Sequence, residues 1–123
     1  MIPKFRIWNM HENMMVTDDQ IIIWNGNVYI NEARKLSPKK LTGWSVDDKY
    51  LMQSTHLKDK NGVEIFEGDV VKMHSGELLP VKLHHGMFEP VCYYISGVFE
   101  RVGNIFENPE LLKHPDFREV NND

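Results

Sequence analysis

Apolar residues in this chain recur mainly at every second position, which is the period of a strand that buries one face. The pattern predicts strands along the whole sequence, separated by short polar runs rich in Gly, Asn and Asp. The expected strands cover residues 4–8, 20–24, 28–30, 44–46, 50–53, 63–66, 70–74, 78–84, 91–95 and 97–102. The fold class that follows is mostly β, either all-β or α+β.

Two Asn-Gly pairs predict tight turns between these strands. Asn25-Gly26 separates two β-rich runs, and Asn61-Gly62 comes before another. Both residue types tolerate the positive φ that tight turns require. We therefore expect a hairpin at Asn25-Gly26 and a structural turn at Asn61 and Gly62.

A third turn is predicted in the segment G-x-x-I-x-x-G-D-x-V, which begins at Gly62. We expect Ile65 to enter the core, Gly68 to form a corner at positive φ, and Asp69 to bond the backbone of the turn. Asp69 as a catalytic acid is the weaker alternative, because it has no paired carboxylate in the sequence. Segments of this type occur in small SH3-like barrels.

Two later runs are expected to be strands with one apolar face each. Pro80 lacks a backbone donor, so the strand over residues 78–84 should lie at an edge or at a bulge. The residues expected to share faces are Leu79, Val81 and Leu83 in that run, and Val91, Tyr93 and Ile95 in the next one.

The domain organisation follows from where the alternation stops. Residues 31–43 contain Pro38 and connect two β segments. Asn108-Pro109-Glu110 begins a short helix, in which Leu111 and Leu112 would dock on the sheet. We expect one domain over residues 1–123, with a possible β subdomain over 1–49, a barrel-like part over 50–113 and a tail over 114–123. The SH3-like barrel would span about residues 50–102, with the helix covering one opening.

Composition narrows the function classes. The net charge is −4, with 41% hydrophobic and 26% charged residues, so the chain is an ordinary globular protein and a poor candidate for wrapping duplex DNA. A local basic patch is conceivable, although a solvated loop is the more common explanation of such a charge run. Its candidate residues are Arg34, Lys35, Lys39, Lys40 and Lys49.

The single cysteine, Cys92, excludes an internal disulfide and fits a reducing compartment. No apolar run reaches the ~18 residues that span a membrane, and the N-terminus lacks the apolar core of a signal peptide. These observations predict a cytoplasmic protein. Cys92 lies in an apolar run, where a buried thiol acts as an inert hydrophobe and not as a nucleophile.

Histidines are the only plausible metal ligands, and their arrangement is unfavourable. His84 and His85 are adjacent on an expected strand and so should point to opposite faces, with His74 nearby in sequence. No Cys-x-x-Cys or His-Glu-x-x-His motif accompanies them. We expect no metal, no cofactor and no catalytic residues.

Aromatic residues are numerous for a chain of this size, and a small β-protein cannot bury all of them. We expect Trp8, Trp44 and Tyr94 to be the most exposed. An exposed aromatic patch would serve either a protein interface or a surface on which bases stack. Unpaired strand edges together with such patches predict a homo-oligomer, with Trp8 or Trp44 near the contact.

Three blocks of the sequence resemble a known family. They are IPKFRIW at Ile2–Trp8, LMQSTHLKDKNGVEIFEGDVV at Leu51–Val71 and VGNIFENPELL at Val102–Leu112. Their order and spacing are similar to those of the YopX family of phage and prophage proteins. Ser54 stands where that family usually has an aromatic residue, and His56 stands where it usually has glycine, so His56 is expected to bear some strain if the position has positive φ.

The resemblance implies a small, mostly β, phage-encoded protein without an assigned activity, and it carries over no catalytic residues. The leading hypothesis is a non-enzymatic accessory module that binds an unidentified host or phage protein. The alternative is a nucleic-acid-binding module that uses exposed aromatics and local lysines. A small hydrolase is a third class, which nothing in the sequence supports directly.

Overall fold

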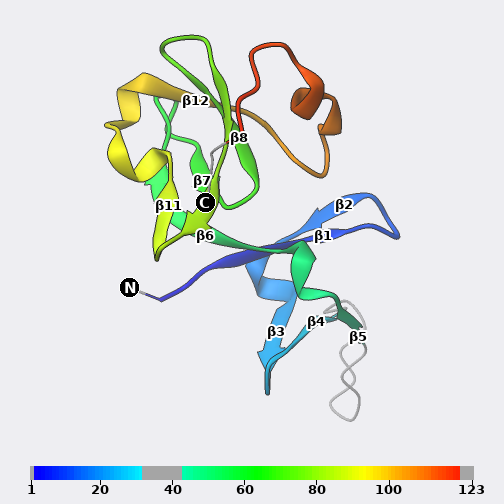
Figure 1. The fold of residues 1–123 in the computed structure, drawn as a ribbon. Coiled ribbons are helices and arrows are strands. Elements are labelled where there is room, and N and C mark those ends of the chain that lie inside the picture. Colours follow the sequence, from blue (N-terminus) through cyan, green and yellow to red (C-terminus); the bar gives the residue numbers. More distant parts are fainter. Residues whose placement is uncertain (1, 32–42, 120–123) are drawn as a thin grey trace. The chain divides into compact units, whose positions relative to one another are not determined.

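The computed structural model describes residues 2–31 and 43–119; of the candidate residues for a basic patch, Arg34, Lys35, Lys39 and Lys40 lie outside these ranges. The chain divides into two compact units, Met1–Gln53 and Ser54–Asp123 (Figure 1). Strands and short 3-10 helices make up the regular structure of the described residues, and the longest of these helices has five residues. The prediction of a mostly β protein is confirmed.

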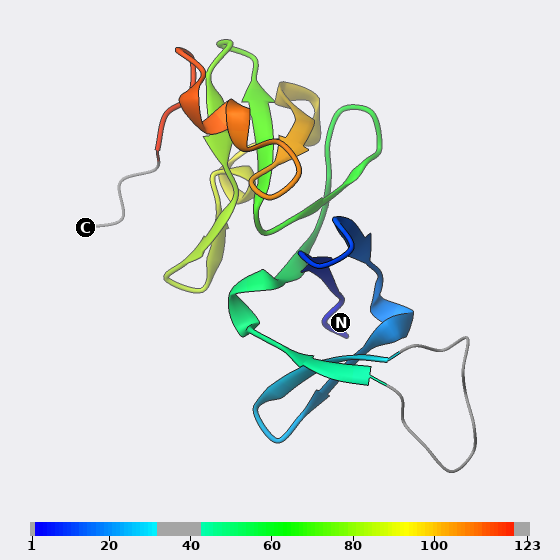
Figure 2. The same cartoon turned by 90° about the vertical axis from the view of Figure 1, so that its right-hand side faces the viewer.

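The first unit consists of antiparallel strands. They pair in the orders β2-β1-β6 and β3-β4-β5 (Figure 2). Strand β6 begins in this unit and ends in the second. The strands are β1 (Phe5–Asn9), β2 (Met14–Val16), β3 (Ile21–Trp24), β4 (Asn27–Asn31), β5 (Gly43–Val46) and β6 (Leu51–Lys58), and the 3-10 helices are η1 (Asp18–Gln20) and η3 (Asp48–Tyr50).

The hairpin predicted at Asn25-Gly26 is confirmed. Trp24 of β3 pairs with Asn27 of β4, so the loop has two residues. Asn25 and Gly26 adopt φ values of 50° and 78°, the left-handed conformation that a two-residue turn requires. Side chains therefore alternate along both strands from this turn.

The core of the first unit is formed by side chains from one face of its paired strands. Four side chains are almost fully buried, namely Ile7, Val16, Val28 and Ile30. Further apolar side chains pack against them while remaining partly exposed, among them Ile21, Trp44, Val46, Tyr50 and Leu51. Strand β2, which carries Val16, is absent from the sequence-based prediction.

The second unit is built on a three-stranded sheet of order β12-β8-β9, a separate hairpin of β10 and β11, and the pairing of β6 with β7. Three 3-10 helices complete it. The strands are β7 (Glu64–Phe66), β8 (Asp69–Met73), β9 (Leu78–Pro80), β10 (Lys82–His84), β11 (Met87–Glu89) and β12 (Phe99–Asn104), and the helices are η4 (Val91–Tyr93), η5 (Ser96–Val98) and η6 (Pro109–Lys113).

The turn between β7 and β8 agrees with its sequence-based description. Ile65 is fully buried in the core, and Gly68 adopts φ 88°. The Oδ2 atom of Asp69 accepts a hydrogen bond of 2.8 Å from the backbone N–H of Phe66. The core around Ile65 also contains Val71, Met73, Val81, Val91 and Phe99.

The single strand expected over residues 78–84 is wrong. The chain breaks it at Val81, whose N–H donates to the carbonyl of Asp69 (2.8 Å) and whose carbonyl accepts from the N–H of Gly68 (2.9 Å). After this point β10 pairs with β11 instead, and Leu83 is exposed. The apolar alternation could not show that Val81 would bind the turn at Gly68.

The strand expected over residues 91–95 is also wrong. The N–H of Tyr93 donates to the carbonyl of Pro90 (3.0 Å) and that of Tyr94 donates to Val91 (3.3 Å), which closes the 3-10 helix η4. Val91 is buried, whereas Tyr93 and Ile95 are 62% and 77% exposed, so they do not share a buried face.

The carboxyl-terminal helix is a 3-10 helix of five residues and has no side-chain cap. The Oδ1 atom of Asn108 accepts instead from the backbone N–H of Asn104, at 3.2 Å. Beyond this helix, Leu78 forms an isolated bridge with Phe117 and exchanges backbone hydrogen bonds with Asp116 and Arg118. The described residues after 114 thus belong to the second unit and do not form a free tail.

Candidate binding site

A surface hollow of about 210 Å³ lies in the first unit, and we call it the aromatic hollow. Three rings from separate elements line it: Trp8 from β1, Trp44 from β5 and Tyr50 from η3. Ile30 forms part of its apolar wall, and His11 and Asp47 contribute polar groups. The hollow is therefore an amphipathic surface with a few polar groups, as is typical of binding sites.

The strand pairings explain why these rings converge. Trp44 lies opposite the buried Ile30 in the pairing of β4 with β5, so its side chain is on the core face of that sheet. Tyr50 ends η3 and packs against the same core. Trp44 and Tyr50 contact the core on one side and line the hollow on the other, and all three rings are half-buried.

Local hydrogen bonds fix the polar residues of the aromatic hollow. The Oδ1 atom of Asp47 accepts from the backbone N–H of Lys49 at 3.0 Å, which caps η3. Asn9 likewise accepts from the N–H groups of His11 and Glu12 at 3.1 and 3.3 Å. The Nζ atom of Lys49 lies 5.1 Å from the centroid of the Tyr50 ring, a cation–π distance.

A second hollow of about 220 Å³, which we call the acidic hollow, shares Ser45, Val46 and Asp47 with the aromatic hollow. It also contains Asp48, the turn residue Gly26 and Asn27, the first residue of β4. Asp47 and Asp48 are both exposed. Carboxylates thus lie beside the aromatic surface, on the N-cap and the first residue of η3.

The structure brings together two of the three predicted interface residues. Trp8 and Trp44 line one hollow, but both are half-buried and neither is the most exposed aromatic residue. Tyr94, in the second unit, is 50% exposed. The most exposed aromatic is Trp24, at 73%, and its position just before the Asn25-Gly26 turn is the signal that would have found it.

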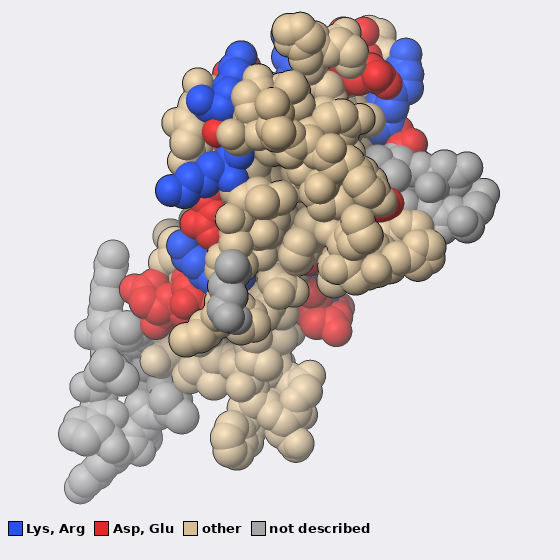
Figure 3. Space-filling view, turned by 90° about the vertical axis from the view of Figure 1, so that its left-hand side faces the viewer, with Lys and Arg blue, Asp and Glu red and all other residues tan. Residues whose placement is uncertain are grey.

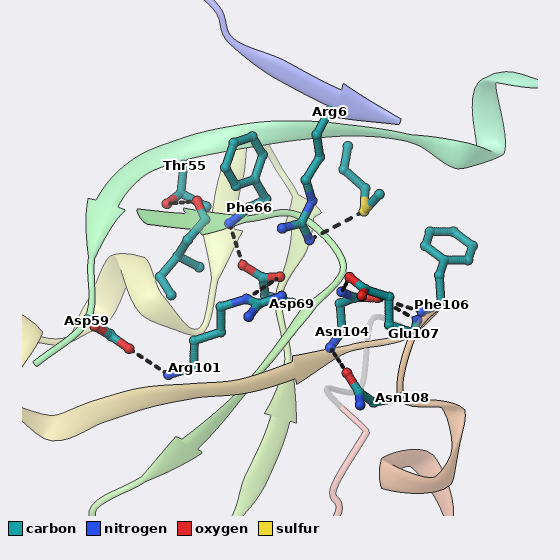
Figure 4. A network of polar contacts seen from close by, with 12 residues as sticks. Arg6, Thr55, Asp59, Phe66, Asp69, Arg101, Asn104, Phe106, Glu107 and Asn108 are labelled. Carbon is teal, nitrogen blue, oxygen red and sulfur yellow. Dashed lines mark hydrogen bonds and ion pairs between the residues drawn. The ribbon is translucent and has the colours of Figure 1, made fainter. Parts of the chain in front are cut away.

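Buried polar groups of the second unit form a structural network (Figure 4). Asp69 is fully buried, and its Oδ1 atom lies 3.0 Å from Nε of Arg101. Because the same carboxylate also binds the Phe66 N–H, its hydrogen bonds hold β7, β8 and β12 in place. Because both oxygens of the carboxylate have partners within the fold, Asp69 is a structural residue of the turn.

Asp59 is a further buried carboxylate, which the sequence analysis did not single out. Its Oδ1 atom accepts from the N–H groups of Asn61 and Val63 (both 2.9 Å), and its Oδ2 atom accepts from that of Arg101 (2.8 Å). Burial acts to raise the pKa of Asp59, but these hydrogen bonds and the Arg101 charge outweigh it and leave the pKa lowered. The signal in sequence is the Asp-x-Asn-Gly spacing of an Asx turn.

Asn104 is another buried polar residue that the sequence analysis did not single out. Its Oδ1 atom accepts from the N–H groups of Phe106 and Glu107, and its Nδ2 atom donates to the Glu107 carboxylate at 2.7 Å. The preceding Gly103 has no room for a side chain, since a Cβ atom there would lie 2.5 Å from Oδ1 of Asn108. The G-N pair of the closing sequence block therefore shapes the turn before η6.

The adjacent histidines do not point to opposite faces. His85 adopts φ 52° in the two-residue turn between β10 and β11, and this brings its ring to 3.9 Å from that of His84. The Nδ1 atom of His84 lies 3.2 Å from the Glu89 carboxylate, which also accepts from the hydroxyl of Tyr93. Among residues 2–31 and 43–119, no three His, Cys, Asp or Glu side chains are grouped to hold a metal ion.

Cys92 is half-buried in η4. Burial and the nearby Glu89 carboxylate raise the pKa of its thiol, which disfavours the thiolate. Within the described part of the chain, no helix is long and apolar enough to cross a membrane.

These features define a class: a small, mostly β protein in which three aromatic rings line a surface hollow. The chain belongs to the YopX family, since the model of that family, described as YopX protein, matches residues 4–113. Its structure is similar to the crystal structure of protein EF1440 from Enterococcus faecalis. The two share 28% identity with a TM-score of 0.59, and the similarity covers 91% of this chain and 99% of that one. No curated protein matches the chain.

Proposed function

We propose that this protein is a non-enzymatic protein-binding module whose contact site is the aromatic hollow. The observation that supports the proposal is the convergence of Trp8, Trp44 and Tyr50 around one hollow of about 210 Å³. Aromatic side chains supply large contact area at low cost in conformational entropy, which makes them frequent anchors of protein interfaces. Its partner would be a host or phage protein.

Charge favours a protein partner over a nucleic acid. The net charge is −4, and on the face drawn in Figure 3 the lysines and arginines lie interspersed with aspartates and glutamates. Single-strand binders combine stacking rings with a basic groove that follows the phosphates. The aromatic hollow has the rings, but its polar wall includes the carboxylate of Asp47.

Intrinsic fluorescence tests the proposal directly, because the chain has three tryptophans. A Trp24→Phe background leaves Trp8 and Trp44, both of which line the hollow. Addition of a degenerate pool of short peptides should shift the emission, and Trp44→Leu, which keeps an apolar contact with the core, should weaken that binding. A pool of single-stranded oligonucleotides should leave the emission unchanged.

Two results would overturn the proposal. The first is emission that responds to oligonucleotides and not to peptides, which would favour the nucleic-acid module. The second is peptide binding that the Trp44→Leu variant retains in full, which would place the contact outside the hollow.

Three further features belong to the same proposal. The protein would be phage-encoded and would act in the cytoplasm of the host cell. It would assemble into a homo-oligomer, an expectation supported by the edge strand β3, which exposes Ile23 and Trp24. The strands around Ile65 and Phe99 in the second unit would form an SH3-like barrel, for which the turn at Gly68 is the supporting feature.

A further inference from the structure

We infer that the aromatic hollow accepts a cationic side chain, the guanidinium of arginine or the ammonium of lysine, from a partner polypeptide. This inference rests on the proposed function and names the chemistry that the site selects. It follows from three features of the first unit: the aromatic rings, the neighbouring carboxylates and the charges of the lining residues.

The rings provide the first argument. The face of an aromatic ring carries negative potential and attracts a cation, most strongly for tryptophan. The hollow presents two tryptophans and one tyrosine from three separate elements. The chain itself already uses this chemistry at the site, where the ammonium of Lys49 lies 5.1 Å from the centroid of Tyr50.

The carboxylates provide the second argument. Asp47 lines the aromatic hollow and the acidic hollow, and Asp48 lines the acidic hollow. Both are exposed, so a ligand can reach them. A cation seated against the rings would therefore have at least one carboxylate close by, which adds a charge-assisted contact.

The charges of the walls provide the third argument. Among the described residues that line the two hollows, none is lysine or arginine, whereas two are aspartate. An acidic ligand would meet these two carboxylates, whereas the Lys49 ammonium beside the hollow already lies over the Tyr50 ring. Complementarity of charge thus selects a basic partner. The net charge of −4 also attracts a positively charged partner over longer distances.

A pair of isosteric peptides tests the charge requirement. One degenerate pool carries a central arginine between uncharged residues, and the other carries citrulline, which has the same shape without the charge. In the Trp24→Phe background, the arginine pool should bind roughly tenfold more tightly than the citrulline pool. A lysine pool should also bind more tightly than citrulline.

Matched variants place the selectivity at the hollow. Asp47→Asn with Asp48→Asn removes two charges, yet an asparagine can still cap η3; this variant should lose roughly threefold or more in affinity for arginine and none for citrulline. The control is Asp18→Asn with Asp19→Asn, which changes the net charge equally at η1, outside both hollows. That control should bind like the parent.

The outcomes separate the inference from the function on which it rests. Equal binding of arginine and citrulline pools, weakened only by Trp44→Leu, would overturn the cation inference and leave the protein-binding module standing. Equal losses in the Asp18/Asp19 control would also overturn it, since they would reveal non-specific attraction. Failure of every peptide pool to change the emission would overturn both.

Discussion

At the scale of single residues, Gly68 carries the corner between β7 and β8 at φ 88°. A side chain in this conformation brings Cβ close to the neighbouring carbonyl. Gly68→Ala should lower the free energy of unfolding by ~1–2 kcal/mol, and Gly68→Val should lower it by more. Urea titration measures the change.

Gly97 offers the matched control for that substitution. It is not in the left-handed region, and a Cβ atom there would have no neighbour within 4 Å. Gly97→Ala should therefore change stability by less than about 0.5 kcal/mol. Equal losses at Gly68 and Gly97 would contradict the role of Gly68 as a corner.

His56 adopts φ 59° in an exposed position of β6, where the YopX pattern has glycine. His56→Gly should raise the free energy of unfolding by up to about 1 kcal/mol, because glycine occupies this region without the steric cost. His56→Ala, which removes the ring but keeps Cβ, should show no comparable gain. A denaturant midpoint that rises for alanine as much as for glycine would assign the effect to the ring and not to the backbone.

At the scale of elements, the turn over residues 59–63 depends on the ionised carboxylate of Asp59. Its pKa in the folded protein is lowered, so the unfolded chain takes up the proton first as the pH falls. The stability that this group contributes is present above about pH 4 and is lost below it. Asp59→Asn should therefore flatten the fall in stability between neutral and acidic pH.

The free energy of unfolding of the same variant should be lower by ~1–3 kcal/mol at neutral pH. The reason is that the amide nitrogen of asparagine would replace one carboxylate oxygen and could not accept a hydrogen bond from a backbone N–H. Urea titrations at several pH values give both results. Glu77→Gln, at an exposed position of the Ser75–Gly76 turn, is the control and should follow the parent protein. If the free energy of unfolding fell in parallel with pH for the parent and for Asp59→Asn, Asp59 would titrate alike in the folded and the unfolded protein, which would contradict the prediction.

The elements that could be predicted from sequence are those with local causes. The Asn25-Gly26 hairpin follows from residues that are adjacent in the chain, and so does the turn at Gly68. The break at Val81 and the 3-10 helix at Val91 have distant or competing causes, which an apolar period of two does not reveal. In the candidate site, composition indicated Trp8 and Trp44, but only strand pairing shows that they share a hollow with Tyr50.

At the scale of the whole molecule, the apolar edge of β3 favours self-association. Among the described strands β3 pairs with β4 alone, and its residues Ile23 and Trp24 are 46% and 73% exposed. An unprotected apolar edge is a template for pairing with a second copy. Light scattering should report a mass above that of one 14.4 kDa chain, and Ile23→Lys should reduce it.

Ile2→Lys is the control, since Ile2 is 86% exposed and lies outside the strands. It should leave the mass unchanged. If the parent protein stayed monomeric at concentrations on the order of tens of micromolar, the prediction of a homo-oligomer would be contradicted. The exposed edge of β3 would then be available to a different partner.

The two Asn-Gly turns also determine how the protein ages chemically. In such a pair the glycine nitrogen can attack the asparagine side chain, releasing ammonia and forming a succinimide that water opens to aspartate or isoaspartate. At Asn61-Gly62 the glycine N–H donates to the Asp59 carbonyl and the asparagine amide donates to Glu100, so both reacting groups are held. Asn25-Gly26 lies exposed at the hairpin tip.

Storage at alkaline pH should therefore deamidate Asn25 before Asn61, which peptide mapping by mass spectrometry would measure. Faster loss at Asn61 would show that its hydrogen bonds give no protection. Because Gly26 lines the acidic hollow, each deamidated molecule would gain a negative charge beside Asp47 and Asp48. Old preparations would then carry a more acidic binding face than fresh ones, and a cationic ligand would bind them differently.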